Sequence, residues 1–305
     1  MTETTSFKYP KIAGEVTPEM LEMPAEELQT VSRYPLTITE DCDALYQWIA
    51  EFMFNELVEN NNQGKPTRWI IPLGPKGQFP LFARMCNEQR VSMKNVFCFH
   101  MDEWLDWQGY PVSIDSPFSL RGYADRHFYD LLDPELHPPE EQIIYPDVFD
   151  IEDYSRKILE AGGVDTTFAG FGYRGHLAFQ ETPNTRWQRI SADEFAAGKT
   201  RIVKILEDSI IAHSQRGSGG YTQCIPQMAI TAGMADMLSA DKILLLTDGG
   251  TWKQWMLRVF LLTTERDSDY AITLCHGHPN VIVAVDKNSA EPISGRFGRH
   301  PQGGS

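Results

Sequence analysis

The chain has 305 residues, and its 42 Asp and Glu outnumber its 27 Lys and Arg, so the formal net charge is −15. A surface this acidic repels the phosphates of nucleic acids and the anionic face of a membrane, and we expect neither as a partner. The composition, 42% hydrophobic and 23% charged, is that of a folded globular protein rather than a disordered chain.

The length predicts one or two domains. We expect a single α/β domain at 36–290, preceded by a Thr-, Glu- and Pro-rich extension at 1–35 and followed by a tail at 291–305. The N-terminus lacks a basic stretch followed by an apolar one, and the longest apolar runs are too short to cross a bilayer. These features predict a cytoplasmic protein. They are compatible with a homo-oligomer.

The cysteine and histidine patterns do not indicate a metal or a disulfide framework. The five cysteines are widely spaced and form no C-x-x-C pair, so we predict reduced thiols. A metal site at His276 and His278 is the less favoured alternative, because two histidines without a third ligand nearby are usually structural. We therefore predict neither a metal nor a cofactor.

Helical and apolar segments alternate along the predicted domain. Residues 41–57 carry apolar side chains at helical spacing behind the N-capping acid Asp41. Further helices are expected at 79–89, 225–238 and 252–262, and a long insertion occupies 188–220. Short apolar runs, predicted as strands, lie at 68–73, 95–100, 165–171, 242–247 and 280–285. This alternation predicts a doubly wound, open, mostly parallel sheet with helices on both faces, and such sheets bind ligands at the carboxyl ends of their strands.

Two of these strand ends carry features of an anion site or a base. A Gly-containing loop at 72–80 leads into a helix whose first amides would favour an anion, although a plain strand-to-helix turn has the same pattern. Asp102 and Glu103 follow the next strand, where a general base would be placed. A helix cap or a solvated loop is the alternative for this pair.

Two further strand ends are rich in glycine. In the segment 170–181, three glycines in six residues surround His176, which can act as acid or base near neutral pH, and Glu181 could orient its ring. A structural histidine is the alternative. After the fourth strand Lys253 lies in the first turn of the next helix, where it is suited to bind phosphate, with a solvated lysine as the alternative.

Four motifs at these loops resemble the glucosamine-6-phosphate deaminase/isomerase family and, more widely, the 6-phosphogluconolactonases. The resemblance covers roughly residues 41–289, and the form H-L-A-F-Q-E at 176–181 points to the deaminases. The motifs are M-D-E-W at 101–104, the Gly-rich segment at 170–181, M-A-I-T-A-G-M at 228–234 and the strand, Gly turn and lysine at 244–253.

The resemblance implies roles for these residues in the chemistry of an anionic sugar phosphate. Asp102 would move a proton between C1 and C2 of the open-chain sugar, with Glu103 beside it, and His176, oriented by Glu181, would serve ring opening. Lys253 and the loop Lys76–Phe79 would hold the phosphate. The set implied to bind the substrate is Lys76, Gly77, Gln78, Phe79, Gly172, Arg174, Gly175, Arg201 and Lys253.

The chain also departs from the family pattern. Arg174 stands where the family has an acid two residues before the histidine, and a guanidinium there should lower the pKa of His176. Ile210 falls where the family has a phosphate-binding arginine, which Arg201 or Arg186 could replace. We therefore carry three hypotheses: aldose–ketose isomerisation with loss of ammonia from a 2-amino sugar, lactone hydrolysis by water activated at His176, and sugar-phosphate binding without catalysis.

Overall fold

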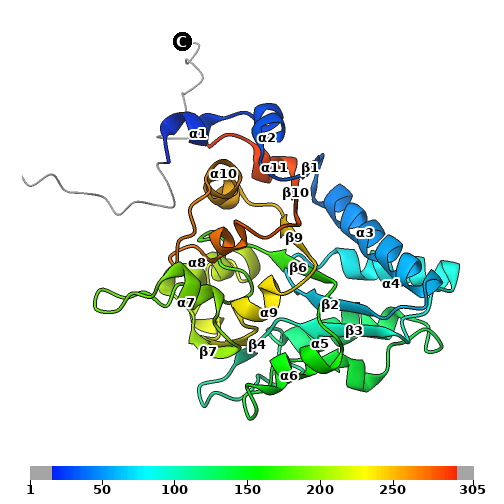
Figure 1. Ribbon diagram of the computed structural model, residues 1–305. Coiled ribbons are helices and arrows are strands. Elements are labelled where there is room, and N and C mark those ends of the chain that lie inside the picture. Colours follow the sequence, from blue (N-terminus) through cyan, green and yellow to red (C-terminus); the bar gives the residue numbers. More distant parts are fainter. Residues whose placement is uncertain (1–15, 294–305) are drawn as a thin grey trace, which may run out of the picture.

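The computed structural model describes residues 16–293, so most of the predicted tail at 291–305 and the start of the predicted extension lie outside the described residues. The central feature is a sheet of seven parallel strands (Figure 1), which confirms the predicted doubly wound α/β fold. In spatial order the strands are β1 (Leu36–Thr39), β10 (Val281–Asp286), β9 (Lys242–Thr247), β6 (Thr166–Gly170), β2 (Thr67–Ile71), β3 (Val96–His100) and β5 (Ile143–Ile144).

Helices cover both faces of this sheet because its strands are apolar on both sides. In β9, Leu244 and Leu246 pack into one core together with side chains of α3, α4 and α5, whereas Leu245 packs into the core on the opposite face, with α6, α9 and α10. The first group is α3 (Cys42–Asn62), α4 (Gln78–Gln89) and α5 (Leu120–His127). The second is α6 (Asp153–Glu160), α9 (Met234–Leu238) and α10 (Gln254–Leu262).

The helix predicted at 41–57 is present and extends five residues further, as α3. Asp41 caps it as expected, because its Oδ1 accepts a hydrogen bond from the Ala44 amide at 2.8 Å. Its apolar positions, including Leu45 and Ile49, are fully buried against the sheet.

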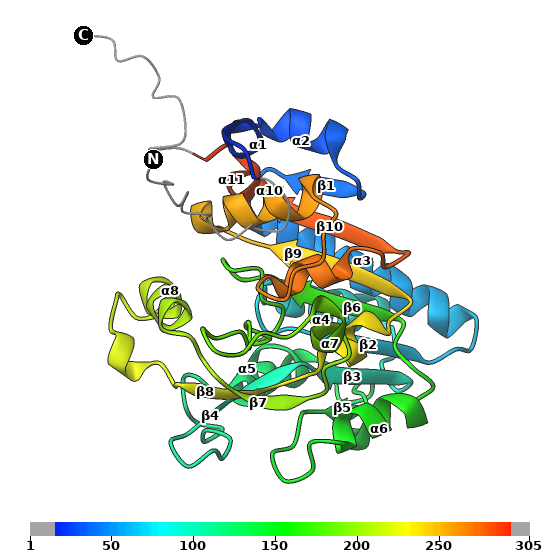
Figure 2. The ribbon, with the colours of Figure 1, turned by 60° about the vertical axis from the view of Figure 1, so that its left-hand side comes forward.

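A second, antiparallel sheet lies to one side of the first (Figure 2), in the order β4 (Asp102–Leu105), β8 (Met228–Thr231), β7 (Arg201–Lys204). The prediction of one helix over 225–238 is therefore wrong: its first half is β8 and only α9 is helical. A continuous apolar run does not distinguish a buried strand from a buried helix. The predicted insertion at 188–220 contains α7 (Ala192–Ala196), β7 and α8 (Glu207–Gly217).

The described part of the N-terminal extension forms α1 (Pro18–Glu22) and α2 (Ala25–Val31), which pack on α10 and on α11 (Lys287–Ala290). The fully buried Arg258 of α10 donates to the backbone oxygens of Met23 at 2.7 Å and Ala290 at 2.9 Å. The division into extension, domain and tail stays a prediction. Short 3₁₀ turns lie at Tyr129–Leu131, Glu140–Gln142, Thr222–Cys224, Thr251–Lys253 and Ala271–Cys275.

The strand order identifies where a ligand would bind. From β2 the chain moves outward to β3 and β5, whereas from β6 it moves in the opposite direction to β9 and β10. The neighbouring strands β2 and β6 therefore form the topological switch point, where loops at the carboxyl ends of the strands diverge and leave room for a ligand. The loops 72–77 and 171–181 begin at this point.

Candidate active site

The two loops at the switch point are in close contact. A side chain on Gly170 would collide with the carbonyl oxygen of Gly74, so the end of β6 and the loop after β2 can touch only because residue 170 has none. Gly77 is similarly covered by the ring of Tyr46 from α3. Glycines are therefore needed here because the end of β6, the loop after β2 and helix α3 approach one another closely.

Asp102 begins β4, directly after the end of β3, and is 8% exposed. Among the described residues its carboxylate has no hydrogen-bond or ion-pair partner. Burial, together with the adjacent Glu103, raises the pKa of Asp102 to about 8. A nearly buried, unengaged carboxylate with a raised pKa has the properties of a general base.

Glu103 has a different environment from its neighbour. Its two carboxylate oxygens accept hydrogen bonds from the amides of Trp104, Leu120 and Arg121 at 2.8–2.9 Å and from Ser119 Oγ at 3.2 Å. Glu103 therefore fixes the start of α5 relative to β4. This is the helix-cap role that the sequence analysis gave as the alternative for the pair. Its effect on Asp102 is electrostatic.

His176 lies in the loop after β6, with its ring against the backbone of Gly172, where a side chain would overlap Nε2. Burial, and next His213 and Lys253, lower the pKa of His176 to about 3, so the imidazole is neutral near pH 7. Nδ1 is buried and makes no hydrogen bond. The loop turns at Gly175, whose φ of 71° suits glycine.

Glu181 does not orient His176 in this structure. Its Oε2 accepts a hydrogen bond from the Leu206 amide at 2.6 Å, at the start of α8, and its Oε1 is buried without a partner. Arg201 donates to Gln180 Oε1 at 2.9 Å and to the Glu181 backbone oxygen at 2.8 Å. Glu181 and Arg201 thus join the His176 loop to α8 and β7.

Loop 171–181 is also tied to the strand that carries Asp102. Thr231, the β8 residue paired with Asp102, accepts a hydrogen bond from the Phe179 amide at 3.1 Å. Gln180 donates to the backbone oxygen of Ala232 at 2.7 Å, and the Ala232 amide donates to Met101. Asp102 and the His176 loop are therefore held in fixed relation through β8.

Arg174, which replaces the family's acid, pairs with Asp208 of α8, with 3.1 Å between Nη1 and Oδ2. Asp208 raises the pKa of His176 while Arg174 lowers it. A carboxylate thus stands near His176 after all, but it comes from α8 rather than from the Gly-rich loop.

Two cations lie beside a single carboxylate at the end of β9 and a third interacts with it through its charge, and we call Lys76, Arg216 and Lys253 the cation cluster. Asp248 Oδ1 is 3.3 Å from Arg216 Nη2 and 3.5 Å from Lys253 Nζ. Lys76 belongs to the same cluster, because burial, then the charge of Arg216, lowers its pKa and Asp248 opposes that change. The cluster combines the predicted Lys76 and Lys253 with an arginine that the sequence analysis missed.

The two lysines differ in exposure. Lys76 is exposed, with Nζ 4.1 Å from the centroid of the Tyr123 ring, whereas Lys253 is 5% exposed. Burial lowers the pKa of Lys253 to about 8, and Asp248 limits the shift. Two helices, α4 and α10, begin beside these lysines, and their N-terminal amides add positive potential for an anion.

Other predicted binding residues have different surroundings. Phe79 is fully buried and stacks on Phe128, with 4.9 Å between ring centroids, and the buried Gln78 donates to the Pro75 oxygen at 2.8 Å. Arg186 is exposed, with its guanidinium over Trp187. None of these side chains joins the cation cluster. Arg216, and not Arg186 or Arg201, supplies the arginine there.

Helix α8 contributes a second residue that the sequence analysis missed. His213 packs against Trp104, with 5.3 Å between ring centroids, and after burial it contributes most to lowering the pKa of His176. Burial lowers the pKa of His213 to about 4. His213 and Arg216 are three residues apart and share one face of α8. The glycines at 217–220 were the only local sign of where this helix ends.

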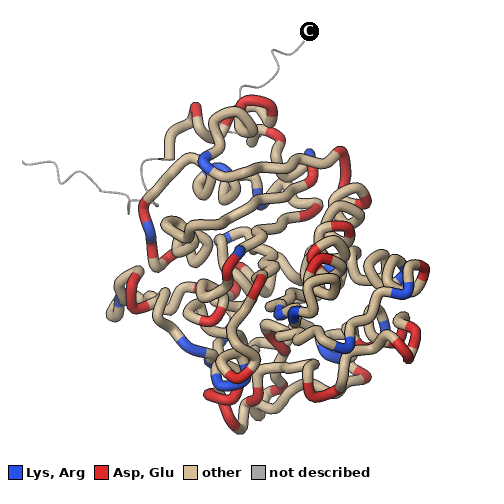
Figure 3. Tube along the Cα trace, turned by 45° about the vertical axis from the view of Figure 1, so that its right-hand side comes forward, with Lys and Arg blue, Asp and Glu red and all other residues tan. Residues whose placement is uncertain are grey.

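The cation cluster is local, because acidic residues are spread over the helices and loops of the tube in Figure 3 and no single basic face is visible there.

Within residues 16–293 we find no helix with the length and apolarity needed to cross a membrane. Those residues also include no group of three His, Cys, Asp or Glu arranged for a metal. His276 Nδ1 instead lies 2.7 Å from Tyr34 OH, and the described cysteines are free thiols.

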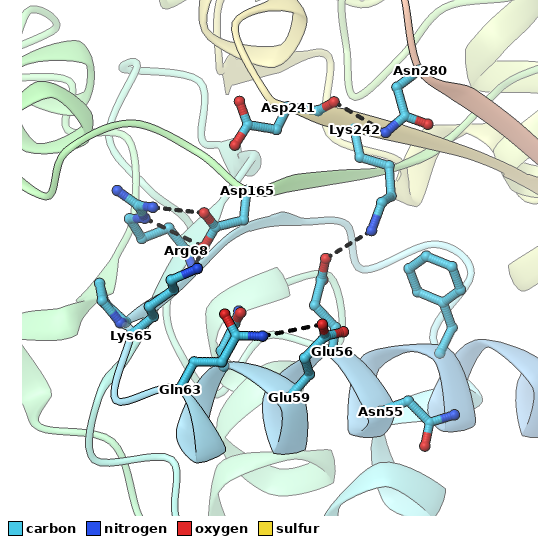
Figure 4. A pocket seen from close by; sticks show the side chains of 13 residues that line it. Asn55, Glu56, Glu59, Gln63, Lys65, Arg68, Asp165, Asp241, Lys242 and Asn280 are labelled. Carbon is cyan, nitrogen blue, oxygen red and sulfur yellow. Dashed lines mark hydrogen bonds and ion pairs between the residues drawn. The ribbon is translucent and has the colours of Figure 1, made fainter.

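A cavity of about 720 Å³ lies at the opposite edge of the sheet, beside the first residues of β2, β6 and β9 (Figure 4). Its charged side chains largely neutralise one another: Glu56 accepts hydrogen bonds from Trp69, Thr166 and Lys242, and Arg68 pairs with Asp165. The side chains that line this cavity form a structural polar network, which is separate from the strand ends that hold Asp102 and His176.

Comparisons with known proteins give matches to glucosamine-6-phosphate deaminases. A glucosamine-6-phosphate deaminase from Porphyromonas gingivalis is 28% identical over 223 residues, which cover 71% of this chain and 78% of that protein. The solved structure of a monomeric glucosamine-6-phosphate deaminase matches with a TM-score of 0.70 at 21% identity, covering 84% of this chain and 98% of that one. No known protein-family model matches the chain.

The fold is also similar to that of a second group of solved structures, the 6-phosphogluconolactonases. A 6-phosphogluconolactonase from Trypanosoma cruzi matches with a TM-score of 0.62 at 14% identity, covering 86% of this chain and 98% of that one. The predicted resemblance is therefore confirmed: the chain is similar in sequence to glucosamine-6-phosphate deaminases, and its α/β fold resembles that of a solved glucosamine-6-phosphate deaminase and of a 6-phosphogluconolactonase.

Proposed function

We propose that the protein is a sugar-phosphate isomerase and deaminase of the glucosamine-6-phosphate deaminase type. The observation that carries the proposal is Asp102, a nearly buried carboxylate without a partner among the described residues, held through β8 beside the loop of His176. The relatives named glucosamine-6-phosphate deaminase support the same activity.

In the proposed reaction Asp102 acts as a base on the open-chain sugar. It removes a proton from C2 of a 2-amino aldose as the C1 oxygen gains one, and then gives a proton to C1 as the amine loses one, which moves the double bond and leaves an imine at C2. Water then adds at C2 and ammonia leaves, so that the product is a ketose phosphate. No oxidant, reductant or cofactor is required, because C1 is reduced as C2 is oxidised within the same molecule, and the net exchange is one water gained for one ammonia lost.

His176 is proposed to serve ring opening. Its neutral imidazole can accept the proton of the anomeric hydroxyl and pass it to the ring oxygen as the bond between C1 and that oxygen breaks. Gly172 and Gly175 shape the loop that presents it, whereas Glu181 and Arg174 act by fixing that loop to α8. Glu103 positions β4 and raises the pKa of Asp102.

The phosphate is proposed to bind at the cation cluster. Lys76, Arg216 and Lys253 supply the charge, and the backbone at Gly77 and Gln78, where α4 begins, supplies amides. The side chains of Gln78 and Phe79 support this loop from within the core. Binding of an anion by a protein of net charge −15 is thereby confined to one edge of the sheet.

Ammonia release and ketose formation from glucosamine 6-phosphate test the proposal, with Asp102→Asn as the matched inactive variant. We expect both products from the wild-type protein and neither from the variant. Turnover of 6-phosphogluconolactone that is lost in His176→Ala would replace the proposal by lactone hydrolysis. Binding of the sugar phosphate without turnover would replace it by a silent binding protein.

The location and assembly of the protein are part of the same proposal. A cytoplasmic location is supported by the free cysteines of the described residues. A homo-oligomer is supported by exposed aromatic residues, such as Trp107 at 85% and Phe149 at 77% exposed. Light scattering on the purified protein tests the assembly, and a mass equal to one chain would contradict it.

A further inference from the structure

Asp248 is a negatively charged residue within the cation cluster, where the phosphate is proposed to bind. It is 8% exposed, at the end of β9, and its carboxylate is held by a hydrogen bond of 2.6 Å from Tyr46 OH. Its other oxygen faces Arg216 and Lys253 at 3.3 Å and 3.5 Å. These distances are longer than those of a tight ion pair, so neither cation is fully committed to Asp248.

The partners of Asp248 come from separate parts of the chain. Tyr46 belongs to α3, Arg216 to α8 and Lys253 to the 3₁₀ turn before α10. The Tyr46 ring covers Gly77, so the group that anchors Asp248 also borders the loop that carries Lys76. Asp248 is therefore built into the centre of the cation cluster rather than placed at its rim.

Charge counting indicates what Asp248 does there. The cation cluster carries three positive charges and Asp248 one negative charge, which leaves a net charge of +2. A phosphate monoester is doubly negative near neutral pH and neutralises this group, whereas a sulfate ester or a carboxylate carries only one charge. Without Asp248 the cluster would remain positive even with a phosphate bound.

We propose that Asp248 weakens the anion site, so that a doubly charged phosphate ester is bound less tightly than the three cations alone would hold it. The inference rests on the proposed function, since it assumes that the substrate's anionic group binds at this cluster. Because Asp248 repels every bound anion, its removal strengthens binding in proportion to the ligand's charge. Neutral ligands are unaffected.

The test measures dissociation constants by calorimetry at low salt, at pH 7 and again at pH 6.5, because removing Asp248 lowers the pKa of Lys253 below about 8 and the lysine must stay protonated. The probes are glucitol 6-phosphate, glucitol 6-sulfate and glucitol, which have no carbonyl group and cannot be isomerised. Asp248→Asn keeps an acceptor for Tyr46, and thermal unfolding confirms that each variant is folded. Asp248→Ser is the second variant, and Asp208→Asn, which removes a carboxylate at the other end of α8, is the matched control.

We expect Asp248→Asn to tighten binding of the sulfate ester by about fivefold and of the phosphate ester by about twenty-fivefold, with no change for glucitol. Asp248→Ser should follow the same order, and Asp208→Asn should change each constant by less than about twofold. Equal gains for the two esters, or weaker binding of the phosphate ester, would overturn the role of Asp248 and leave the proposed function intact. Failure of both esters to bind any variant would overturn the proposed anion site and the role of Asp248 together.

Discussion

Arg174, in the loop after β6, and Asp208, at the start of α8, form an ion pair with 3.1 Å between Nη1 and Oδ2. Both side chains are more than one third exposed, at 39% and 43%, so the pair adds little to the stability of the fold. Its consequence is local, because the two charges act in opposite directions on the pKa of His176.

Asp208→Asn should therefore reduce activity more than stability. It leaves the charge of Arg174 unopposed beside His176, lowers the pKa of that imidazole further and releases one contact of α8. We expect a loss in kcat/KM of up to about tenfold, as one pKa unit would give, and nearly unchanged thermal unfolding.

A charge reversal supplies the control for this pair. The double variant Arg174→Asp with Asp208→Arg restores an ion pair of opposite polarity and should retain more activity than either single variant. Wild-type kcat/KM in Asp208→Asn, or a double variant no better than the worse single one, would show that the pair does not act on the site.

Much of the fold was predictable from the sequence because the central strands are continuous apolar runs. The runs predicted at 95–100, 165–171 and 242–247 contain β3, β6 and β9, and only their ends differ by a residue. Strands β1 and β5 were missed because they are edge strands of only four and two residues, too short to show a pattern. The small sheet was missed because β8 continues directly into the apolar α9.

The site was predictable only where a local motif marks it. Asp102, His176 and Lys253 follow strands, but Arg216 and His213 come from α8, within a segment that the sequence marked only as an insertion. Asp248 lies in a recognised turn, yet nothing local indicates that Tyr46, about 200 residues earlier, holds it. The expected bond between Glu181 and His176 is absent, and the Glu181 carboxylate instead accepts a hydrogen bond from the Leu206 amide through Oε2.

The activity should have a narrow dependence on pH. Asp102 must be deprotonated to act as a base, and its pKa is about 8, so activity should rise with pH through that value. Lys253 must be protonated to bind the phosphate, and its pKa is also about 8, so activity should fall above it. The profile of kcat/KM should be a bell centred near pH 8.

Lys253→Arg separates the two limbs of that bell. Arginine stays protonated over the whole range, so the alkaline limb should disappear while the acidic limb, which reports Asp102, remains. A profile that is flat between pH 6 and 9 in the wild-type protein would contradict the assignment of both groups.

Gly172→Ala tests the position of the His176 ring. The added methyl group would overlap Nε2 and displace the imidazole. We expect a loss of kcat of about a hundredfold, as for a catalytic group moved by about 1 Å, in a protein that still folds. Gly217→Ala is the control because a side chain there meets nothing. Unchanged kcat in Gly172→Ala would place His176 outside the reaction.

Glu56 should matter for stability and not for activity. Its carboxylate accepts hydrogen bonds from Trp69 Nε1 at 2.7 Å, Thr166 Oγ1 at 2.7 Å and Lys242 Nζ at 3.0 Å, at the edge of the sheet opposite the site. Glu56→Ala leaves these donors without their acceptor and should lower the free energy of unfolding by about 3 kcal/mol.

Denaturant unfolding measures that change, and kcat/KM of the folded variant checks that the site is intact. Glu56→Gln keeps one acceptor and should cost about half as much. A free energy of unfolding equal to that of the wild-type protein in Glu56→Ala would mean that the polar network does not contribute to stability.

The most direct measurement of the central claim follows the C2 proton of glucosamine 6-phosphate in deuterated water by NMR. If Asp102 moves that proton, the wild-type protein releases ammonia and forms a ketose phosphate that carries solvent deuterium at C1. Asp102→Asn should bind the sugar phosphate with similar affinity and lose both signals by at least about a thousandfold. Ammonia release at the wild-type rate in Asp102→Asn, or a wild-type protein that binds the sugar phosphate and leaves its C2 proton untouched, would contradict the account.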